Sequence, residues 1–245
     1  MSSVEFGPNG SVVKDDSGGI DRIKQELAQK EHAYPDGKPR PVETFARFAR
    51  IGLIIWSAEI CLQAPMLAGY YFAPHSLPEV FFNIGGNTAL NVMTLSGWLL
   101  FLTAIATFIM VGRFTYRAQK NLFTVGSPIV KMAPGWTVGW YFIPIAAIWQ
   151  PFLGMSQIYR GTYAAVGEAG KSTTLLAVWW GAWISLNIPD WISRVWEDSL
   201  MMTYILQLAD TALGVTAALA LVKIVGQVAE RQALLLRGGV ALVFD

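Results

Sequence analysis

Residues 136 to 160 read W-T-V-G-W-Y-F-I-P-I-A-A-I-W-Q-P-F-L-G-M-S-Q-I-Y-R, and this stretch decides how the chain is organised. It carries no charge before Arg160, so it is apolar enough to enter a bilayer. Gly139, Pro144 and Pro151 interrupt it, and a smooth spanning helix does not need such breaks. The stretch therefore predicts an all-α integral membrane protein with one irregular, re-entrant or interfacial segment.

The composition of the whole chain supports a membrane protein. Of its 245 residues 53% are hydrophobic and 14% are charged, whereas soluble domains carry about a quarter charged residues. The net charge of +1 gives no basis for a nucleic-acid partner. His32 and His75 form no metal-ligand pattern, and we expect neither a metal nor a cofactor. Cys61, the single cysteine, is interpreted as a small buried hydrophobe.

The N-terminal part of the chain has a different character. Residues 1 to 50 hold eight Lys/Arg and eight Asp/Glu, which predicts a polar cytoplasmic tail over 1–45, largely disordered. A short helix is expected near 20–33, either lying on the membrane surface or transiently formed in water. Three prolines at 35, 39 and 41 predict an extended linker after it. No cleavable signal peptide is visible, so the first span is expected to act as an uncleaved anchor.

Four apolar segments in the membrane domain, 46–232, match the length that crosses about 30 Å of hydrocarbon. They cover 51–73, 88–112, 173–192 and 200–222, and a short C-terminal tail follows at 233–245. The second helix is expected to continue to about Leu122, because no breaker precedes Gly126. Arg113, Arg117 and Lys120 follow the second span. They either set the topology or meet anionic lipid headgroups.

The positive-inside rule distinguishes two topologies for the irregular segment. If residues 136–155 cross, there are five spans, and the basic C-terminal stretch lies outside. If they dip in and return, there are four spans with both termini inside, and 17 of the 18 Lys and Arg residues are cytoplasmic. Only Arg194 is then external. The sequence therefore favours four spans and a re-entrant or interfacial segment, with five spans as the alternative.

Two acids inside predicted spans form the candidate polar site. Glu59 has Gln63 one turn away, and Asp210 has Gln207 one turn away. In the four-span topology the depths of the two acids differ by about 6 Å. The acids are either a proton or cation relay, or a neutral hydrogen-bonded acid that specifies helix packing. Packing is the favoured interpretation, because the sequence shows only one broken segment and no internal repeat.

No signature of a soluble enzyme is present, so no catalytic residue is assigned and enzymatic activity is not expected. The stretch G-E-A-G-K-S-T at 167–173 superficially resembles a phosphate-binding loop. It lacks the first glycine at the required spacing, because Ala165 occupies that place, and no strand is predicted before it. A P-loop is therefore rejected.

The block from Arg117 to Arg160 resembles a bacterial family of multi-pass membrane proteins catalogued as a domain of unknown function. The pattern R-A-x-x-N-L, then P-G-W-x-V-G-W-x-F-x-P-I-A-x-x-W-x-P, then I-x-R carries the resemblance. Its principal positions here are Arg117, Asn121, Gly126, Trp136, Gly139, Trp140, Pro144, Trp149, Pro151 and Arg160. The chain departs from the pattern at Ala147, Gln150 and Gln157, where the family has polar or charged groups.

The resemblance implies a bacterial inner-membrane protein and no particular activity, while the distribution of Lys and Arg predicts that the N-terminus is cytoplasmic. The chain keeps the apolar residues of the family pattern and loses the polar or charged groups at positions 147, 150 and 157. We therefore expect a scaffold, an accessory subunit or a lipid-contacting component. The alternative is a small proton- or cation-coupled transporter that uses the intramembrane carboxylates. The expected partners are the lipid bilayer and a larger membrane complex or a second copy of the chain.

Overall fold

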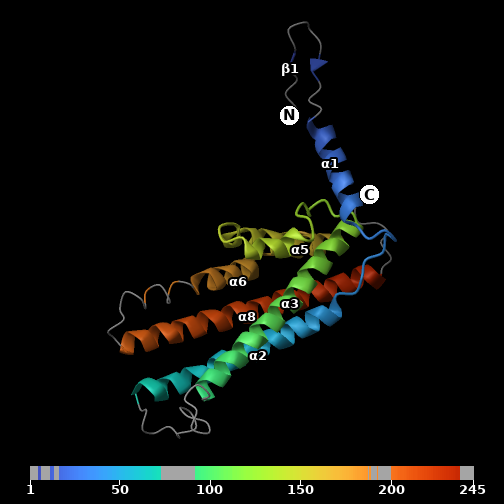
Figure 1. The fold of residues 1–245 in the computed structure, drawn as a ribbon. Helices are drawn as coiled ribbons and strands as arrows, with labels where there is room; N and C mark the ends of the chain where they lie inside the picture. The colour runs from blue at the N-terminus through green and yellow to red at the C-terminus, as the bar shows by residue number, and fades with distance from the viewer. Residues whose placement is uncertain are drawn as a thin grey trace.

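The computed structural model describes residues 5–6, 12–13, 17–72, 92–186, 188, 192 and 200–237. Helices dominate this part of the chain (Figure 1). Two short strands, β1 (Glu5–Phe6) and β2 (Val12–Val13), pair antiparallel near the N-terminus. The helices are α1 (Ser17–His32), α2 (Glu43–Phe72), α3 (Val92–Thr124), α4 (Trp136–Gly139), η3 (Trp140–Phe142), η4 (Ala146–Ile148), α5 (Gln150–Ala165), α6 (Thr174–Ser185) and α8 (Leu200–Arg237).

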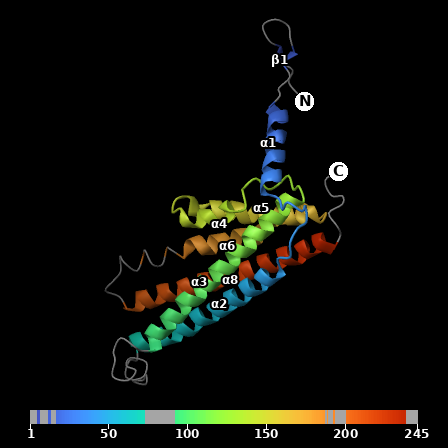
Figure 2. The ribbon, with the colours of Figure 1, turned by 45° about the vertical axis from the view of Figure 1, so that its right-hand side comes forward.

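Three long helices form the body of the molecule. Helix α2 packs against both α3 and α8, and α3 crosses α8 obliquely in both views (Figures 1 and 2). Within the described residues, three helical stretches are long and apolar enough to cross a membrane: Glu43–Gly69, Thr94–Thr124 and Met201–Arg237. A predominantly helical chain with candidate membrane spans in these three regions is therefore confirmed.

The fourth predicted span, at 173–192, is only partly described. Helix α6 is apolar and packs along α8, but its 12 residues extend about 18 Å. That length is short of the roughly 30 Å of a hydrocarbon core. Residues 187, 189–191 and 193–199 lie outside the described part of the chain.

The core of the protein lies toward one end of the long helices, partly within the predicted spans and partly beyond them. Helix α3 continues to Thr124, close to the predicted end at Leu122, while α8 runs 15 residues past its predicted span. Helix α5 packs against both extensions. The largest fully buried side chains gather here and include Phe114, Leu122, Tyr159 and Ile224.

Elsewhere along α2 and α3 the helices expose apolar side chains. Leu62 on α2 and Trp98 and Leu102 on α3 are more than half exposed, as expected of helix faces that meet lipid. Cys61 is also exposed, so its interpretation as a buried hydrophobe is wrong. The cysteine lies on the outward face of α2, beside Leu62, and not on the face that packs against another helix.

A glycine ends helix α3. Gly126 has a positive φ of 72°, and its N–H donates to the Phe123 carbonyl at 3.1 Å. The N–H of Ser127 donates to the Leu122 carbonyl at 3.0 Å. This pair of bonds is the Schellman arrangement, in which only glycine adopts the left-handed conformation without strain. The family-motif glycine therefore turns the chain away from α3.

The irregular segment leaves this turn and comes back to the same end of α3. Gln157 on α5 accepts hydrogen bonds from the N–H groups of Lys131 and Met132, both at 2.9 Å. Gly161, one turn further on, lies close against Val130. The residues before and after the segment are therefore held together.

The two prolines act differently. Pro144 separates η3 from η4, as predicted. Pro151 lies in the first turn of α5, where a helix needs no N–H donor. The prediction of a second break at Pro151 is therefore wrong, because the residue starts a helix.

Candidate functional site

Glu59 contacts α3 through one of its two carboxyl oxygens. The Thr103 hydroxyl donates to Glu59 Oε1 at 3.1 Å. Among the described residues, Glu59 Oε2 is buried without a hydrogen-bond partner, and so is the Thr107 hydroxyl one turn along α3. Gly52 packs against Thr107 so closely that a β-carbon there would collide with it. The contact between the candidate spans α2 and α3 therefore contains a polar stripe, made of Glu59, Thr103 and Thr107.

The second acid of the predicted polar site, Asp210, lies about one helical turn from the level of Glu59. Helices α2 and α8 are antiparallel, since Gly214 packs against Ile60 while Tyr204 meets Phe72 with ring centroids 5.4 Å apart. This register puts Asp210 near the level of Gln63. Asp210 and Gln63 are half-buried and Gln207 is exposed. The structure thus places the two acids at neighbouring levels and gives Glu59 its partner on α3.

The best-connected family-motif residue is Asn121. Its Nδ2 donates to the Arg40 carbonyl and to Gln232 Oε1, both at 2.8 Å, and its Oδ1 accepts the Arg40 N–H at 2.8 Å. Gln232 Nε2 donates to the Ala118 carbonyl and to the Thr162 hydroxyl, both at 3.1 Å. Asn121 and Gln232 are each 1% exposed. We call Arg40, Asn121, Thr162 and Gln232 the polar junction; it joins the linker, α3, α5 and α8.

A second polar contact holds the entrance of the irregular segment. Gln119 Nε2 donates to the Met132 carbonyl at 2.7 Å and to Gln157 Oε1 at 3.3 Å. Gln157 Oε1 thus accepts three bonds, counting those from Lys131 and Met132. A carboxylate oxygen accepts in the same way. The departure from the family pattern at Gln157 therefore keeps the acceptor and removes only the charge.

Basic residues at the end of α3 hold the linker. Arg117 donates to the Pro41 carbonyl at 3.0 Å, and its guanidinium lies 4.8 Å from the centre of the Phe45 ring. The Lys120 ammonium lies 4.7 Å from the centre of the Tyr34 ring. Burial raises the pKa of the Tyr34 hydroxyl, which stays neutral at physiological pH. These cations have a structural use that charge counting does not predict.

The tryptophans of the irregular segment lie at its surface. Trp136 and Trp140 stack, with ring centroids 4.6 Å apart, and a β-carbon on Gly139 would lie 3.2 Å from the Trp136 ring. Trp149 precedes α5 and is 46% exposed. Pro144 is exposed as well. These family-motif residues shape an apolar surface and bring no reactive groups together.

An aromatic and charged cluster between α5 and α8 was not predicted. Tyr159 and Tyr163 both donate to Gln227 Oε1, at 3.0 and 3.3 Å. Arg231 lies 4.1 Å from the centre of the Tyr163 ring and pairs with Glu168 at 3.1 Å. Burial, and then the bond to Tyr163, raises the pKa of the Tyr159 hydroxyl. The signal in the sequence was a tyrosine pair spaced by one helical turn.

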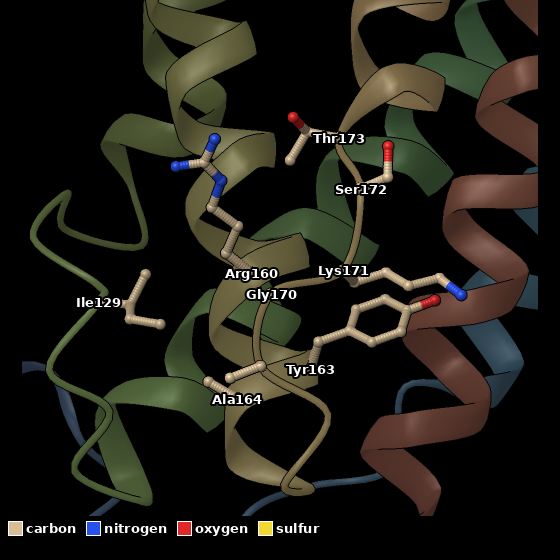
Figure 3. Close-up of a pocket in the computed structure, with 9 residues that line it drawn as sticks. Ile129, Arg160, Tyr163, Ala164, Gly170, Lys171, Ser172 and Thr173 are labelled. Carbon is tan, nitrogen blue, oxygen red and sulfur yellow. The ribbon is translucent and has the colours of Figure 1, made fainter.

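Arg160 lies apart from that cluster, at the rim of a cleft between α5 and the start of α6 (Figure 3). The cleft has a volume of about 530 Å³. The lining residues come from the loop after α3, from α5 and from the stretch between α5 and α6: Ile129, Arg160, Tyr163, Ala164, Ala169, Gly170, Lys171, Ser172 and Thr173.

Comparison with known proteins identifies a family for this chain. The family model described as "Domain of unknown function (DUF4328)" matches residues 86–230. This confirms the resemblance to a family with a domain of unknown function. No curated protein and no solved structure matches the chain.

Proposed function

The chain belongs to the DUF4328 family, and we propose that it is a multi-pass protein of the bacterial inner membrane that contacts lipid and has no catalytic activity of its own. In this proposal it has four spans, both termini in the cytoplasm and a re-entrant segment over 136–149. It serves as a scaffold or an accessory subunit. The single observation that carries the proposal is the surface of that segment.

The surface of the segment is apolar, and it is exposed. Phe142 and Ile145 are 71% and 72% exposed, Ile148 is 55% exposed, and Trp136 and Trp149 are about half exposed. No charged residue interrupts 136–149. Exposed apolar patches of this kind mark sites of contact with membranes or other proteins. The bilayer is the occupant that suits a segment packed against the candidate span α3.

The position of the segment along α3 supports a shallow insertion. The Phe108 ring meets Tyr141 and Phe142 with centroids 5.6 and 5.7 Å apart. Phe108 precedes Arg113 by five residues, or about 7.5 Å along the helix. If Arg113 marks the cytoplasmic surface, the tip of the segment lies inside the cytoplasmic leaflet.

Irregular backbone at membrane depth requires hydrogen-bond partners and cover from protein. The Trp180 indole N–H on α6 donates to the Ile148 carbonyl at 3.0 Å, and Ala147 N–H donates to the Ile143 carbonyl at 2.7 Å. Gly112 on α3 packs against Val138. These contacts satisfy part of the broken backbone and hold it against α3 and α6.

The test measures depth and sidedness separately in a Cys61→Ala background. A spin label at Phe142→Cys in lipid vesicles is expected to be more accessible to oxygen than to a water-soluble nickel reagent. A label at exposed Lys131→Cys serves as the matched control and is expected to show the reverse. Equal nickel accessibility at the two positions would refute insertion.

Sidedness is tested at positions before and after the segment. Lys131→Cys and Ala169→Cys are both exposed and are expected to react with a membrane-impermeant maleimide only from the cytoplasmic side. Labelling of the two positions from opposite sides would show that the segment crosses and that there are five spans.

A second candidate function, a small proton- or cation-coupled transporter, is favoured by one observation. Glu59 carries a buried oxygen without a partner among the described residues, and an ionisable group in a span is a functional candidate. In reconstituted vesicles, ion flux that Glu59→Gln abolishes and Thr107→Val leaves intact would favour transport. Absence of flux in the wild-type protein would remove this candidate.

A further inference from the structure

The cleft between α5 and α6 has the charge of an anion site. Two cations, Arg160 and Lys171, are among its lining residues, and no carboxylate is. Within the described part of the chain, the Arg160 guanidinium forms neither a hydrogen bond nor an ion pair, so its donors are available. The nearby Glu168 does not compete, because it pairs with Arg231 on α8 at 3.1 Å.

Hydroxyl and backbone donors face the same region. Figure 3 shows Arg160 rising from α5 toward Thr173, with Ser172 beside Thr173 at the start of α6. The Ser172 hydroxyl bonds to Thr174, accepting its N–H at 3.3 Å. Thr173 makes no capping bond to α6, which leaves its hydroxyl available. The first N–H groups of a helix have no partner within it and favour negative charge.

The loop that shapes the cleft depends on two glycines. Gly167 and Gly170 have φ values of +79° and +84°, a conformation that strains other residues. Gly167 ends α5, and the Glu168 N–H closes the turn on the Tyr163 carbonyl at 2.8 Å. Gly170 turns the chain again before Lys171, whose side chain extends over the Tyr163 ring, away from Arg160 (Figure 3). Lys171 therefore adds positive potential at the rim and no direct contact.

We propose that this cleft binds a phosphate group, held by the Arg160 guanidinium, the Thr173 hydroxyl and the first turn of α6. A guanidinium forms paired, charge-assisted hydrogen bonds with phosphate oxygens, and a helix N-terminus suits the same anion. The site is not a P-loop, because helix α5 and not a strand precedes the loop. The phosphate comes either from a lipid headgroup or from a free phosphate in the cytoplasm.

This inference goes beyond the proposed function, because binding of free phosphate in detergent does not require the 136–149 segment to enter a bilayer. The first arm measures the unfolding midpoint of the full chain in detergent while inorganic phosphate is titrated against chloride at equal ionic strength. A ligand of the folded state raises this midpoint, because it stabilises that state by RT ln(1 + [L]/Kd). Phosphate also stabilises proteins without binding, so the quantity compared is the difference between variants.

Three variants make the comparison specific. Arg160→Gln removes the principal donor, and Ala169→Glu places a carboxylate in the cleft without removing any described hydrogen bond. Lys131→Gln is the matched control, with the same loss of charge at an exposed position that does not line the cleft. The apparent affinity for phosphate is expected to fall about tenfold in the first two variants and to stay within about twofold in the control.

The second arm identifies the source of the phosphate. The same variants are unfolded in nanodiscs of phosphatidylcholine, with or without phosphatidic acid. Stabilisation by phosphatidic acid that depends on Arg160 would assign the site to a headgroup, and dependence on Arg160 with inorganic phosphate alone would assign it to free phosphate. If Arg160→Gln and Ala169→Glu respond like Lys131→Gln in both arms, or if the wild type responds in neither, the proposal is overturned.

Discussion

Replacement of Asn121 by alanine tests whether the polar junction stabilises the fold. The substitution removes three hydrogen bonds of 2.8 Å, two to the Arg40 backbone and one to Gln232. Each intramolecular hydrogen bond contributes about 1 kcal/mol, and a buried group left without a partner costs more. We therefore expect the free energy of unfolding to fall by about 3 kcal/mol, which is a change of roughly 150-fold in the unfolding equilibrium.

The measurement is unfolding by titration of sodium dodecyl sulfate into mixed micelles, followed by circular dichroism. Gln207→Ala is the matched control, because it truncates an amide at an exposed position and is expected to change stability by less than about 0.5 kcal/mol. Asn121→Asp should cost at least as much as Asn121→Ala, since its buried carboxylate would face two acceptors, the Arg40 carbonyl and Gln232 Oε1. A loss of less than about 1 kcal/mol in Asn121→Ala, or a loss equal to that of Gln207→Ala, would refute the reasoning.

Two further predictions use the same titration. Gly126→Ala should destabilise the protein by about 1–2 kcal/mol because its φ is positive, whereas Gly97→Ala, in a helix with open space around it, should stabilise it by up to about 1 kcal/mol; equal signs would contradict the assignment of the α3 terminus. Thr107→Val should be neutral or stabilising, because it replaces a buried hydroxyl without a described partner. Thr103→Val should cost about 1–3 kcal/mol, since it leaves Glu59 Oε1 unpartnered; the reverse order would show that the polar stripe is wrongly described.

Much of the helical architecture follows from local physical chemistry and was predictable from the sequence. The length of the apolar segments predicted three of the candidate spans. The absence of a helix breaker before Gly126 predicted that α3 ends at about Leu122, two residues before its end at Thr124 in the structure. Pro144 lies in the break between η3 and η4, as its missing backbone N–H predicts. The prediction for Pro151 was wrong, because a proline, which lacks an N–H donor, is also favoured in the first turn of a helix.

The contacts that hold the ends of these helices together were beyond sequence reasoning. Asn121 and Gln232 are 111 positions apart, and nothing local to either amide shows that they meet. Cys61 was misplaced for a related reason: apolar character does not distinguish a face toward lipid from a face toward another helix. The family pattern marked Asn121 and Arg160 as notable, but their surroundings came only from the fold.

The polar junction has a consequence for the order in which the chain matures. Asn121 can bind the Arg40 backbone as soon as α3 has been made, but Gln232 reaches the same amide only after α8 is complete. At a synthesis rate of about 5–20 residues per second, the junction waits roughly 6–20 s for its last member. During that interval, the Asn121 Nδ2 lacks its Gln232 acceptor. A ribosome that stalls before residue 232 therefore leaves a nascent chain in which the linker and α3 are joined but α8 is not yet bonded to them.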